Sequence, residues 1–258
     1  MESLKYGFCL TKVIKIDNLG IMKKIKLLKV LEKSPVFNLK TVKDITGKKG
    51  SYVKILIFRL KKEGLIFEIE KNKYTVHKDP LVIASYLVWP CYLSFWTALR
   101  HHDLTEQLPN AIFVATTRAK KNRLLRFNGT EIIFTKIKPS CFFGFAKEKY
   151  RDFDIFVAEP EKAVIDSALF KKLSFSEISH IVRDSITNFD TDKLIRYLLR
   201  VKSKALIKRF GFLLDSAGKD VFDKLRHHVS GEYIKADYAL AKRGKKNKKW
   251  KVIENVKL

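Results

Sequence analysis

Acidic residues are scarce in this chain. Among 258 residues, 27 Asp and Glu stand against 53 Lys and Arg, which gives a formal net charge of +26. Surfaces that are stabilised by ion-pair networks mix both signs, so such networks do not account for this excess. Clustered positive charge attracts polyanions, and their binding is favoured by the release of counterions. The composition therefore predicts nucleic acid as the partner.

Cysteine is also rare. The three cysteines, Cys9, Cys91 and Cys141, lie far apart and form no C-x-x-C pattern, which argues against a disulfide framework and a zinc knuckle. The adjacent histidines of His101-His102 and His227-His228 would point about 100° apart on a helix, which does not suit chelation of a metal. We therefore expect neither a metal nor a cofactor.

Long apolar runs are missing as well. The longest, from Leu81 to Trp89, ends at Pro90 and is shorter than the roughly 20 residues that span a bilayer. The apolar stretch near the N-terminus is too short and too interrupted for a signal peptide. We expect a cytoplasmic protein without a membrane partner.

Length and hydrophobic content predict the domain organisation. A chain of 258 residues, 46% of them hydrophobic, can bury a substantial core and is expected to hold two modules. Because a clean helical pattern begins at Met22, residues 1–21 are interpreted as an N-terminal extension. The two predicted domains are residues 22–78 and residues 79–258.

The first module has the order of elements found in a winged helix-turn-helix. Its predicted elements are helices over Met22–Lys33, Leu39–Thr46 and Ser51–Glu63, followed by strands over Leu65–Glu70 and Lys73–His77. Gly47 can take a positive φ and is expected to end the second helix. The apolar residues of the third helix have the spacing of a buried stripe: Val53, Leu56, Ile57 and Leu60.

The charge of this module favours double-stranded DNA. From Met1 to Lys78, 19 Lys and Arg stand against 7 Asp and Glu, a formal charge of +12. The third helix would enter the major groove, where its first residues reach phosphates and base edges. The predicted DNA-binding residues are Lys48, Lys49, Ser51, Tyr52, Lys54, Arg59, Lys71 and Lys73. The open alternative is a protein–protein module whose charges are solvated.

The second module mixes helix and strand signals, so the expected fold class is α+β. We expect an N-terminal winged helix-turn-helix, then a mixed α/β domain with a small sheet and a mainly helical C-terminal part. Helices are predicted over Pro80–Val88 and Tyr92–His101, and mostly helical structure from Pro160 to about Val229. Strands are predicted over Ala111–Thr117, Leu124–Phe127, Glu131–Lys136, Phe142–Phe145 and Phe153–Val157. Tyr92 and Trp96 are interpreted as core residues rather than base-stacking ones.

Two basic runs in this module form a candidate secondary DNA-binding surface. The first is a predicted loop that contains Arg118, Lys120, Lys121 and Arg123. The second lies near the C-terminus and contains Lys242, Arg243, Lys245, Lys246, Lys248 and Lys249. Both could contact phosphate backbones without sequence preference. The C-terminal run is expected to be a basic tail, either a disordered solubilising end or a basic hairpin.

One pattern of acidic residues suggests an enzyme. Asp152-Phe153-Asp154, at the start of a predicted strand, is similar to the D-x-D that holds metal ions in nucleotidyltransferases. The Gly-Ser pair that such a site also needs is missing, because the preceding segment offers only Phe143-Gly144-Phe145. Nucleophile-elbow and phosphate-loop patterns are missing too. We expect no enzymatic activity, with a metal-dependent nucleic-acid enzyme that uses Asp152 and Asp154 as the alternative.

Two blocks of the second module carry a family resemblance. The run Tyr92-Leu93-Ser94-Phe95-Trp96-Thr97-Ala98-Leu99, continuing to Gln107, and the run Val157-Ala158-Glu159-Pro160-Glu161-Lys162-Ala163, continuing to Asp166, resemble the AbiEi family of type IV antitoxins. The residues that match the family's motifs are Tyr92, Ser94, Ala98, Leu99, Gln107, Pro160, Glu161, Lys162 and Asp166. Asp103 stands where the family commonly has glycine. Lys162 and Asp166, four residues apart on one helix face, are expected to pair.

The resemblance implies an antitoxin that also represses transcription. In that family the winged helix binds inverted repeats in the promoter of its own operon. The second domain counteracts a cognate nucleotidyltransferase-like toxin, and direct contact with the toxin is left open. The remaining alternative, which rests on charge alone, is an architectural protein that binds RNA or DNA without sequence preference.

Overall fold

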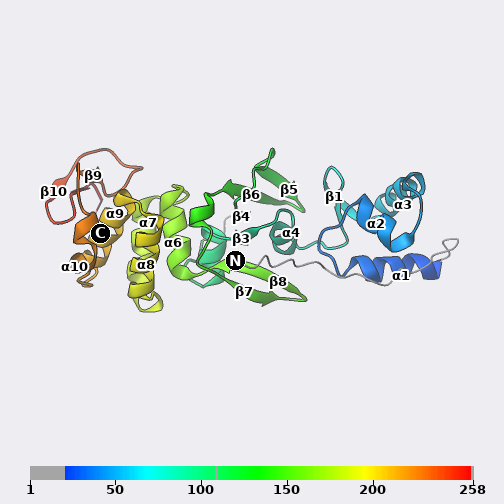
Figure 1. Ribbon diagram of the computed structural model, residues 1–258, viewed down its shortest axis with the longest axis horizontal. Helices are drawn as coiled ribbons and strands as arrows, with labels where there is room; N and C mark the ends of the chain where they lie inside the picture. Colours follow the sequence, from blue (N-terminus) through cyan, green and yellow to red (C-terminus); the bar gives the residue numbers. More distant parts are fainter. Residues whose placement is uncertain (1–20, 108–109, 257–258) are drawn as a thin grey trace. The chain divides into compact units, whose positions relative to one another are not determined.

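A computed structural model describes residues 21–107 and 110–256 (Figure 1). Most of the predicted extension 1–21 therefore lies outside the described residues. The chain divides into two compact units, with the division between Leu87 and Val88; the predicted domain boundary follows Lys78. Its fold is α+β, as predicted. Among the described residues, every helix is too short or too polar to cross a membrane.

The first unit consists of a group of helices and one hairpin. Its elements are α1 (Ile21–Leu31), α2 (Leu39–Thr46), α3 (Gly50–Lys62), β1 (Phe67–Glu70), β2 (Lys73–Thr75) and α4 (Pro80–Tyr86). β1 and β2 pair antiparallel, and an isolated bridge joins Phe37 to Tyr74. The core of the unit lies among α1, α2, α3 and the hairpin, with Leu27, Leu31, Val42 and Leu60 fully buried.

Local sequence signals set the ends of α2. The side chain of Asn38 accepts a hydrogen bond from the backbone amide of Thr41, and Thr41 Oγ1 accepts one from the backbone amide of Asn38. Gly47 ends the helix with φ 65°, in the left-handed region that favours glycine. The turn to α3 is therefore fixed by residues next to it in the chain.

The second unit is built around a six-stranded sheet. Its strands are β3 (Cys91–Leu93), β4 (Ala111–Thr116), β5 (Leu124–Phe127), β6 (Thr130–Lys136), β7 (Phe145–Tyr150) and β8 (Phe153–Ala158). Their order in the sheet is β5-β6-β4-β3-β8-β7. β3 runs antiparallel to β4 and parallel to β8, whereas β4 and β6 are parallel. The Asn128-Gly129 turn joins β5 to β6, as predicted.

The helix predicted over Tyr92–His101 is wrong in its first half. Tyr92 and Leu93 belong to β3, and the helix α5 covers Trp96–His101. Phe95, with φ 56° and ψ −139°, turns the chain between the two. The reason lies in the tertiary structure. β3 lies between two neighbouring strands, which satisfy its backbone groups, and all three of its side chains are buried.

The strand predicted over Phe142–Phe145 is also misplaced. The 3-10 helix η1 (Pro139–Cys141) ends at Phe142, and β7 begins only at Phe145. Proline at the first position of η1 favours a helical turn there. The strand predicted over Phe153–Val157 is found as β8, and β7 pairs with it at the edge of the sheet.

Helices follow the sheet, and α6 is the central one. The helices are α6 (Pro160–Leu169), α7 (Phe175–Asp184), α8 (Thr191–Val201), α9 (Lys204–Ser216) and α10 (Phe222–Leu225), with the 3-10 turns η2 (Ile186–Asn188) and η3 (Arg226–His228). α6 contacts β8, α5, α7, α8 and α9, and Figure 1 shows it next to α7 and α8. Its residues from Glu161 to Ala168 are all buried.

A small second sheet closes the C-terminal region. It contains β9 (Ile234–Lys235), β10 (Lys245–Asn247) and β11 (Val252–Glu254) in the order β10-β11-β9. β10 and β11 form an antiparallel hairpin. The predicted basic tail is thus a folded hairpin, which was one of the two structures that the sequence left open.

Candidate functional site

The outer face of α3 carries basic side chains around two exposed apolar ones, Ile55 and Phe58, which we call the apolar ridge. The predicted stripe Val53, Leu56, Ile57 and Leu60 is buried, and the face opposite to it is exposed. On that face the side chains of Ile55 and Phe58 are 53% and 66% exposed. Lys54 and Arg59 are exposed beside them. This face could therefore contact both phosphates and the apolar parts of a partner.

Ile55 and Phe58 were missed by the sequence prediction, which considered only the polar and basic residues of α3. A signal for them was available. Both are apolar, yet neither falls on the stripe with the spacing of a buried face. A single exposed apolar residue is ordinary, but two of them three residues apart on one helix form an apolar patch that can serve as a contact surface.

The start of α3 is suited to an anion. Lys49 occupies the N-cap, and its side chain makes no capping hydrogen bond. The first amide groups of a helix are available to phosphate oxygens when no side chain caps them. Ser51 and Tyr52 are exposed in this first turn, whereas Lys48 is half-buried. Four of the predicted DNA-binding residues thus lie together at one helix end.

The hairpin places its two predicted lysines differently. Lys71 is exposed at the turn, beside Asn72, which has φ 61°. Lys73 is bound by two groups of its own unit. Its Nζ lies 2.8 Å from Glu70 Oε1 and donates to the carbonyl of Leu87 at 2.6 Å. Lys73 therefore serves the packing of the unit, and Lys71 is the better placed of the two for a phosphate.

In the second unit, the two motif blocks meet in one buried polar cluster, although about 70 residues separate them. The hydroxyl groups of Tyr92 and Ser94 both donate to Asp166 Oδ2, at 2.8 and 2.9 Å. Lys162 Nζ donates to Tyr92 Oη at 2.8 Å and forms an ion pair with Asp166 Oδ1. The predicted pairing of Lys162 with Asp166 is confirmed. We call these four residues the buried cluster.

Water does not reach the buried cluster. The exposed fraction is 1% for Tyr92 and 0% for Ser94, Lys162 and Asp166. Burial raises the pKa of the Asp166 carboxyl and lowers the pKa of the Lys162 ammonium, because each charge has lost its hydration. Burial and the nearby Asp166 carboxylate also raise the pKa of Tyr92. Side chains that are this buried do not face a substrate, and the loss of one partner would leave the other charge buried without compensation.

The other motif residues are divided between packing and surface. Ala98 and Leu99 are buried in α5, and Gln107 is exposed. Pro160 begins α6, and Glu161 accepts a hydrogen bond from the backbone amide of Asp190 at 2.8 Å. Lys193 lies 3.6 Å from the other oxygen of Glu161. Glu161 thus joins the start of α6 to the start of α8.

The acids of the D-x-D pattern do not form a metal-binding cluster. Asp152 is exposed in the turn before β8, and the two oxygens of Asp154 lie 2.7 Å from Lys147 Nζ and 2.7 Å from Lys149 Nζ. These lysines lower the pKa of the Asp154 carboxyl through hydrogen bonds. Within residues 21–107 and 110–256, no three His, Cys, Asp or Glu side chains gather in a way that could hold a metal ion.

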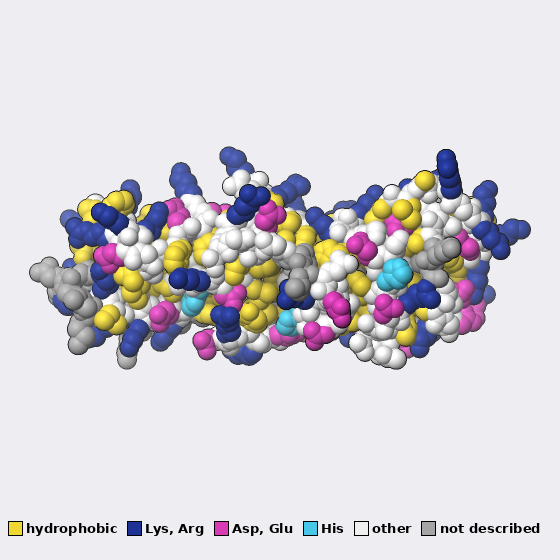
Figure 2. All heavy atoms as spheres, turned by 180° about the vertical axis from the view of Figure 1, so that it is seen from behind, with side chains coloured by type: hydrophobic (Ala, Val, Ile, Leu, Met, Phe, Trp, Pro, Cys, Tyr) yellow, Lys and Arg dark blue, Asp and Glu magenta, His cyan; other side chains and the backbone are white. Residues whose placement is uncertain are grey.

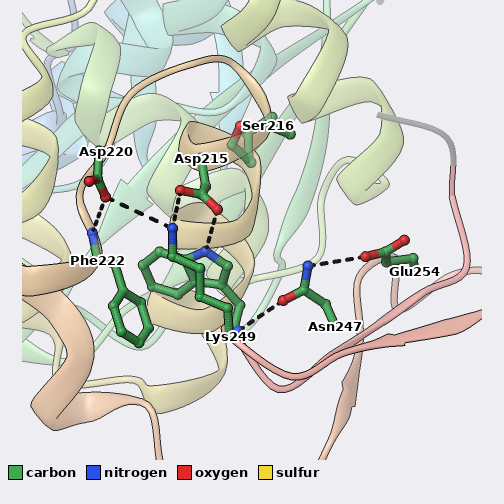
Figure 3. Close-up of polar contacts among 9 residues, drawn as sticks. Asp215, Ser216, Asp220, Phe222, Asn247, Lys249 and Glu254 are labelled. Carbon is green, nitrogen blue, oxygen red and sulfur yellow. Dashed lines mark hydrogen bonds and ion pairs between the residues drawn. The ribbon is translucent and has the colours of Figure 1, made fainter.

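Part of the C-terminal basic run is used to hold the hairpin (Figure 3). Lys249 Nζ lies 2.6 Å from Asp215 Oδ1 on α9 and 3.9 Å from Asp220 Oδ1. Asn247 donates to Glu254 across the hairpin at 3.1 Å. Lys249 is therefore an anchor of the fold, so the surface available to a partner is formed by the other five basic residues of this run.

The hairpin also buries a tryptophan against a glycine. Trp250 is fully buried, and its indole Nε1 donates to Asp215 Oδ2 at 3.2 Å. Its ring meets the ring of Phe222 edge-on at 5.1 Å. An ideal Cβ on Gly211 of α9 would lie 2.1 Å from a ring atom of Trp250. Only glycine leaves room for the indole at this position.

Basic side chains are spread over the surface of both units (Figure 2). In the loop after β4, Arg118, Lys121 and Arg123 are exposed and Lys120 is half-buried. In the C-terminal run, Lys242, Arg243, Lys245, Lys246 and Lys248 are exposed. The structure thus places both parts of the predicted secondary surface within the second unit, at the sheet and at the hairpin.

Comparison with known proteins gives a structural match only. None of the protein-family models matches this chain, and none of the curated proteins does. The chain is similar in structure to the RV2827C protein from Mycobacterium tuberculosis, whose crystal structure matches with a TM-score of 0.62. The match covers 89% of this chain and 90% of that one, at 13% sequence identity. At this identity, the likeness concerns the fold alone.

Proposed function

We propose that this protein is a DNA-binding repressor and the antitoxin of a type IV toxin–antitoxin pair. The observation that carries the DNA-binding half is the outer face of α3, where Lys54 and Arg59 flank exposed apolar side chains. The resemblance of two sequence blocks to AbiEi antitoxins supports the other half. Repression and neutralisation are assigned to different units and can be tested separately.

In this proposal the first unit is a winged helix-turn-helix. α2 and α3 are the helix-turn-helix, the β1–β2 hairpin is the wing, and α3 enters the major groove. The uncapped start of α3 and the exposed Lys49 and Lys54 contact phosphates. Lys71 at the hairpin turn reaches a neighbouring phosphate. These contacts hold the protein on DNA without reading its sequence.

The apolar ridge supplies a sequence preference. Ile55 and Phe58 are the most exposed apolar side chains of α3. In the major groove, the apolar group that distinguishes one base is the methyl group of thymine. Burial of Phe58 against that methyl group removes apolar surface from water. The operator is therefore expected to contain thymines at the positions that α3 covers.

Two substitutions on α3 should weaken DNA binding in different ways. Lys54→Gln should lower affinity for all duplexes and reduce the slope of log K against log salt by about 1, because one phosphate contact is lost. Phe58→Ala should reduce preference for the operator over random DNA by a factor on the order of 10 and leave the slope unchanged. Fluorescence anisotropy at several salt concentrations, on the promoter of its own operon and on random DNA, measures both.

Lys29→Gln provides a matched control. Lys29 is exposed on α1, outside the proposed contact face. The Lys29→Gln variant should therefore keep the wild-type slope of log K against log salt. If all three variants behave alike, α3 is not the reader. If the wild type binds its promoter and random DNA equally, the protein is an architectural protein rather than a repressor.

The antitoxin half of the proposal is supported by the convergence of the two motif blocks. Residues matched in the first block, Tyr92 and Ser94, contact residues matched in the second, Lys162 and Asp166. If the resemblance reflects a shared fold, the two motif blocks should lie together in space although they are far apart in the chain. Antitoxicity would then depend on the surface of the second unit.

Co-expression tests this half directly. Expression of the nucleotidyltransferase-like protein encoded beside this chain should arrest growth, and co-expression of this chain should restore it. Lys54→Gln should restore growth as well as the wild type does, because α3 belongs to the other unit. Growth arrest that persists with the folded wild-type protein would overturn the antitoxin assignment and leave the DNA-binding proposal unaffected.

A further inference from the structure

A basic cavity lies at one edge of the six-stranded sheet. β4 and β6 are parallel neighbours, so their carboxyl ends, at Thr116 and Lys136, reach the same edge. The loop from residue 117 to residue 123 leaves β4 at this edge and leads into β5. The cavity is thus formed where the ends of two neighbouring strands and one basic loop come together.

The lining of the cavity is strongly cationic. A cavity of about 120 Å³ is lined by Thr116, Arg118, Ala119, Lys120, Arg123, Phe134 and Lys136. Four of these seven side chains carry positive charge, and no carboxylate belongs to the lining. Four like charges around one cavity repel one another, which favours an anion between them.

Other contacts position parts of this lining. Thr116 Oγ1 donates to the carbonyl of Pro90 at 2.6 Å and accepts from the backbone amide of Arg118 at 3.2 Å, which fixes the start of the loop. Lys120 Nζ lies 4.9 Å above the ring of Phe134. Within the part of the chain that the structure describes, Arg118, Arg123 and Lys136 form no ion pair with a carboxylate.

Size and charge together indicate the ligand. The cavity is much smaller than the roughly 300–1,000 Å³ of pockets that enclose a drug-sized molecule, so it accepts a single small group. Arginine forks match the oxygens of a phosphate. A phosphate monoester carries a charge of about −1.5 to −2 at neutral pH, more than an internal phosphodiester, and so suits four cations better.

We propose that this cavity binds a terminal phosphate monoester, from a free nucleotide or from the 5′ end of a nucleic-acid strand. Arg118 and Arg123 hold the phosphate oxygens, while Lys120 and Lys136 supply further charge. The rest of the ligand lies outside the cavity. The proposal does not depend on DNA reading by α3, because every lining residue belongs to the second unit.

The test compares probes that differ only in the terminal phosphate. AMP is compared with adenosine, and a single-stranded oligonucleotide with a 5′-phosphate is compared with the same oligonucleotide with a 5′-hydroxyl, by isothermal titration calorimetry. The wild type should bind at least one phosphorylated probe about tenfold more tightly than its partner, as expected for charge-assisted hydrogen bonds. A preference within the AMP pair assigns the site to free nucleotides, and a preference confined to the oligonucleotides assigns it to strand ends.

Two double variants separate the cavity from general positive charge. Arg118→Gln/Arg123→Gln should abolish the preference for the phosphorylated probe. Lys121→Gln/Arg126→Gln removes the same number of charges from the loop and from β5, but none from the lining of the cavity, and should keep the preference. Equal binding of both members of each pair by the wild type would overturn the proposal. So would equal losses in the two double variants.

Discussion

Asp166→Asn should destabilise the second unit by about 3–5 kcal/mol, because it leaves the Lys162 ammonium buried without its counter-charge. Lys162 is fully buried, and Tyr92 Oη is its other hydrogen-bond partner in the buried cluster. The asparagine amide also turns a donor toward groups that already donate to this position, the hydroxyls of Tyr92 and Ser94. The variant should unfold at a much lower urea concentration than the wild type.

Tryptophan fluorescence makes this measurement specific to one unit. The three tryptophans, Trp89, Trp96 and Trp250, all lie in the second unit, so a urea titration followed by fluorescence reports its free energy of unfolding. As a control, Lys162→Met/Asp166→Leu replaces both charges by apolar groups and should be far less damaging than Asp166→Asn, since no unpaired charge is buried. Ordinary surface substitutions change the free energy of unfolding by up to about 0.5 kcal/mol. If Asp166→Asn changed it by no more than that, the ion pair of Lys162 and Asp166 would contribute little to stability.

Gly211→Ala should have the second large effect. The added Cβ would lie 2.1 Å from the indole of Trp250, so either α9 must move or the hairpin must release the ring. Overpacking usually costs about 1–3 kcal/mol. Loss of the Trp250 side chain from the core costs about 3–5 kcal/mol. The expected loss of unfolding free energy is therefore about 1–5 kcal/mol, and the same fluorescence titration measures it.

A double variant shows whether the clash is the cause. In a Trp250→Leu background, Gly211→Ala should no longer destabilise the unit. It should raise the free energy of unfolding by as much as about 1 kcal/mol, because alanine favours a helix more than glycine does. The two substitutions should therefore be strongly non-additive, as expected of residues in direct contact. Additive losses would contradict the close approach of Gly211 and Trp250.

Local sequence signals predicted part of this fold well. α2 was predicted with its observed bounds, because Asn38 and Gly47 fix its ends within the segment itself. The Asn128-Gly129 hairpin was likewise found from its turn residues. The prediction of a helix at Tyr92 failed because β3 is defined by β4 and β8, which follow later in the chain. A short apolar run does not reveal such partners.

The candidate sites were predictable to a similar extent. The spacing of Lys162 and Asp166 was enough to predict their pairing, since both lie on one helix. Their contacts with Tyr92 and Ser94 depend on the docking of α6 beside β3, which no local pattern contains. The basic loop was recognised from its composition, but the cavity that it forms with β6 arises only when two parallel strands end at one edge.

The last strand of the sheet, β7, affects the solubility of the molecule. Within the described residues, β7 pairs on one side only, with β8. An open strand edge can recruit a strand from another molecule and so begin aggregation. β7 carries Lys147, Glu148 and Lys149 in succession, and both lysines are directed to Asp154 on β8. A second molecule that approached this edge would have to bury these charges, so the strand that ends the sheet also protects it from self-association.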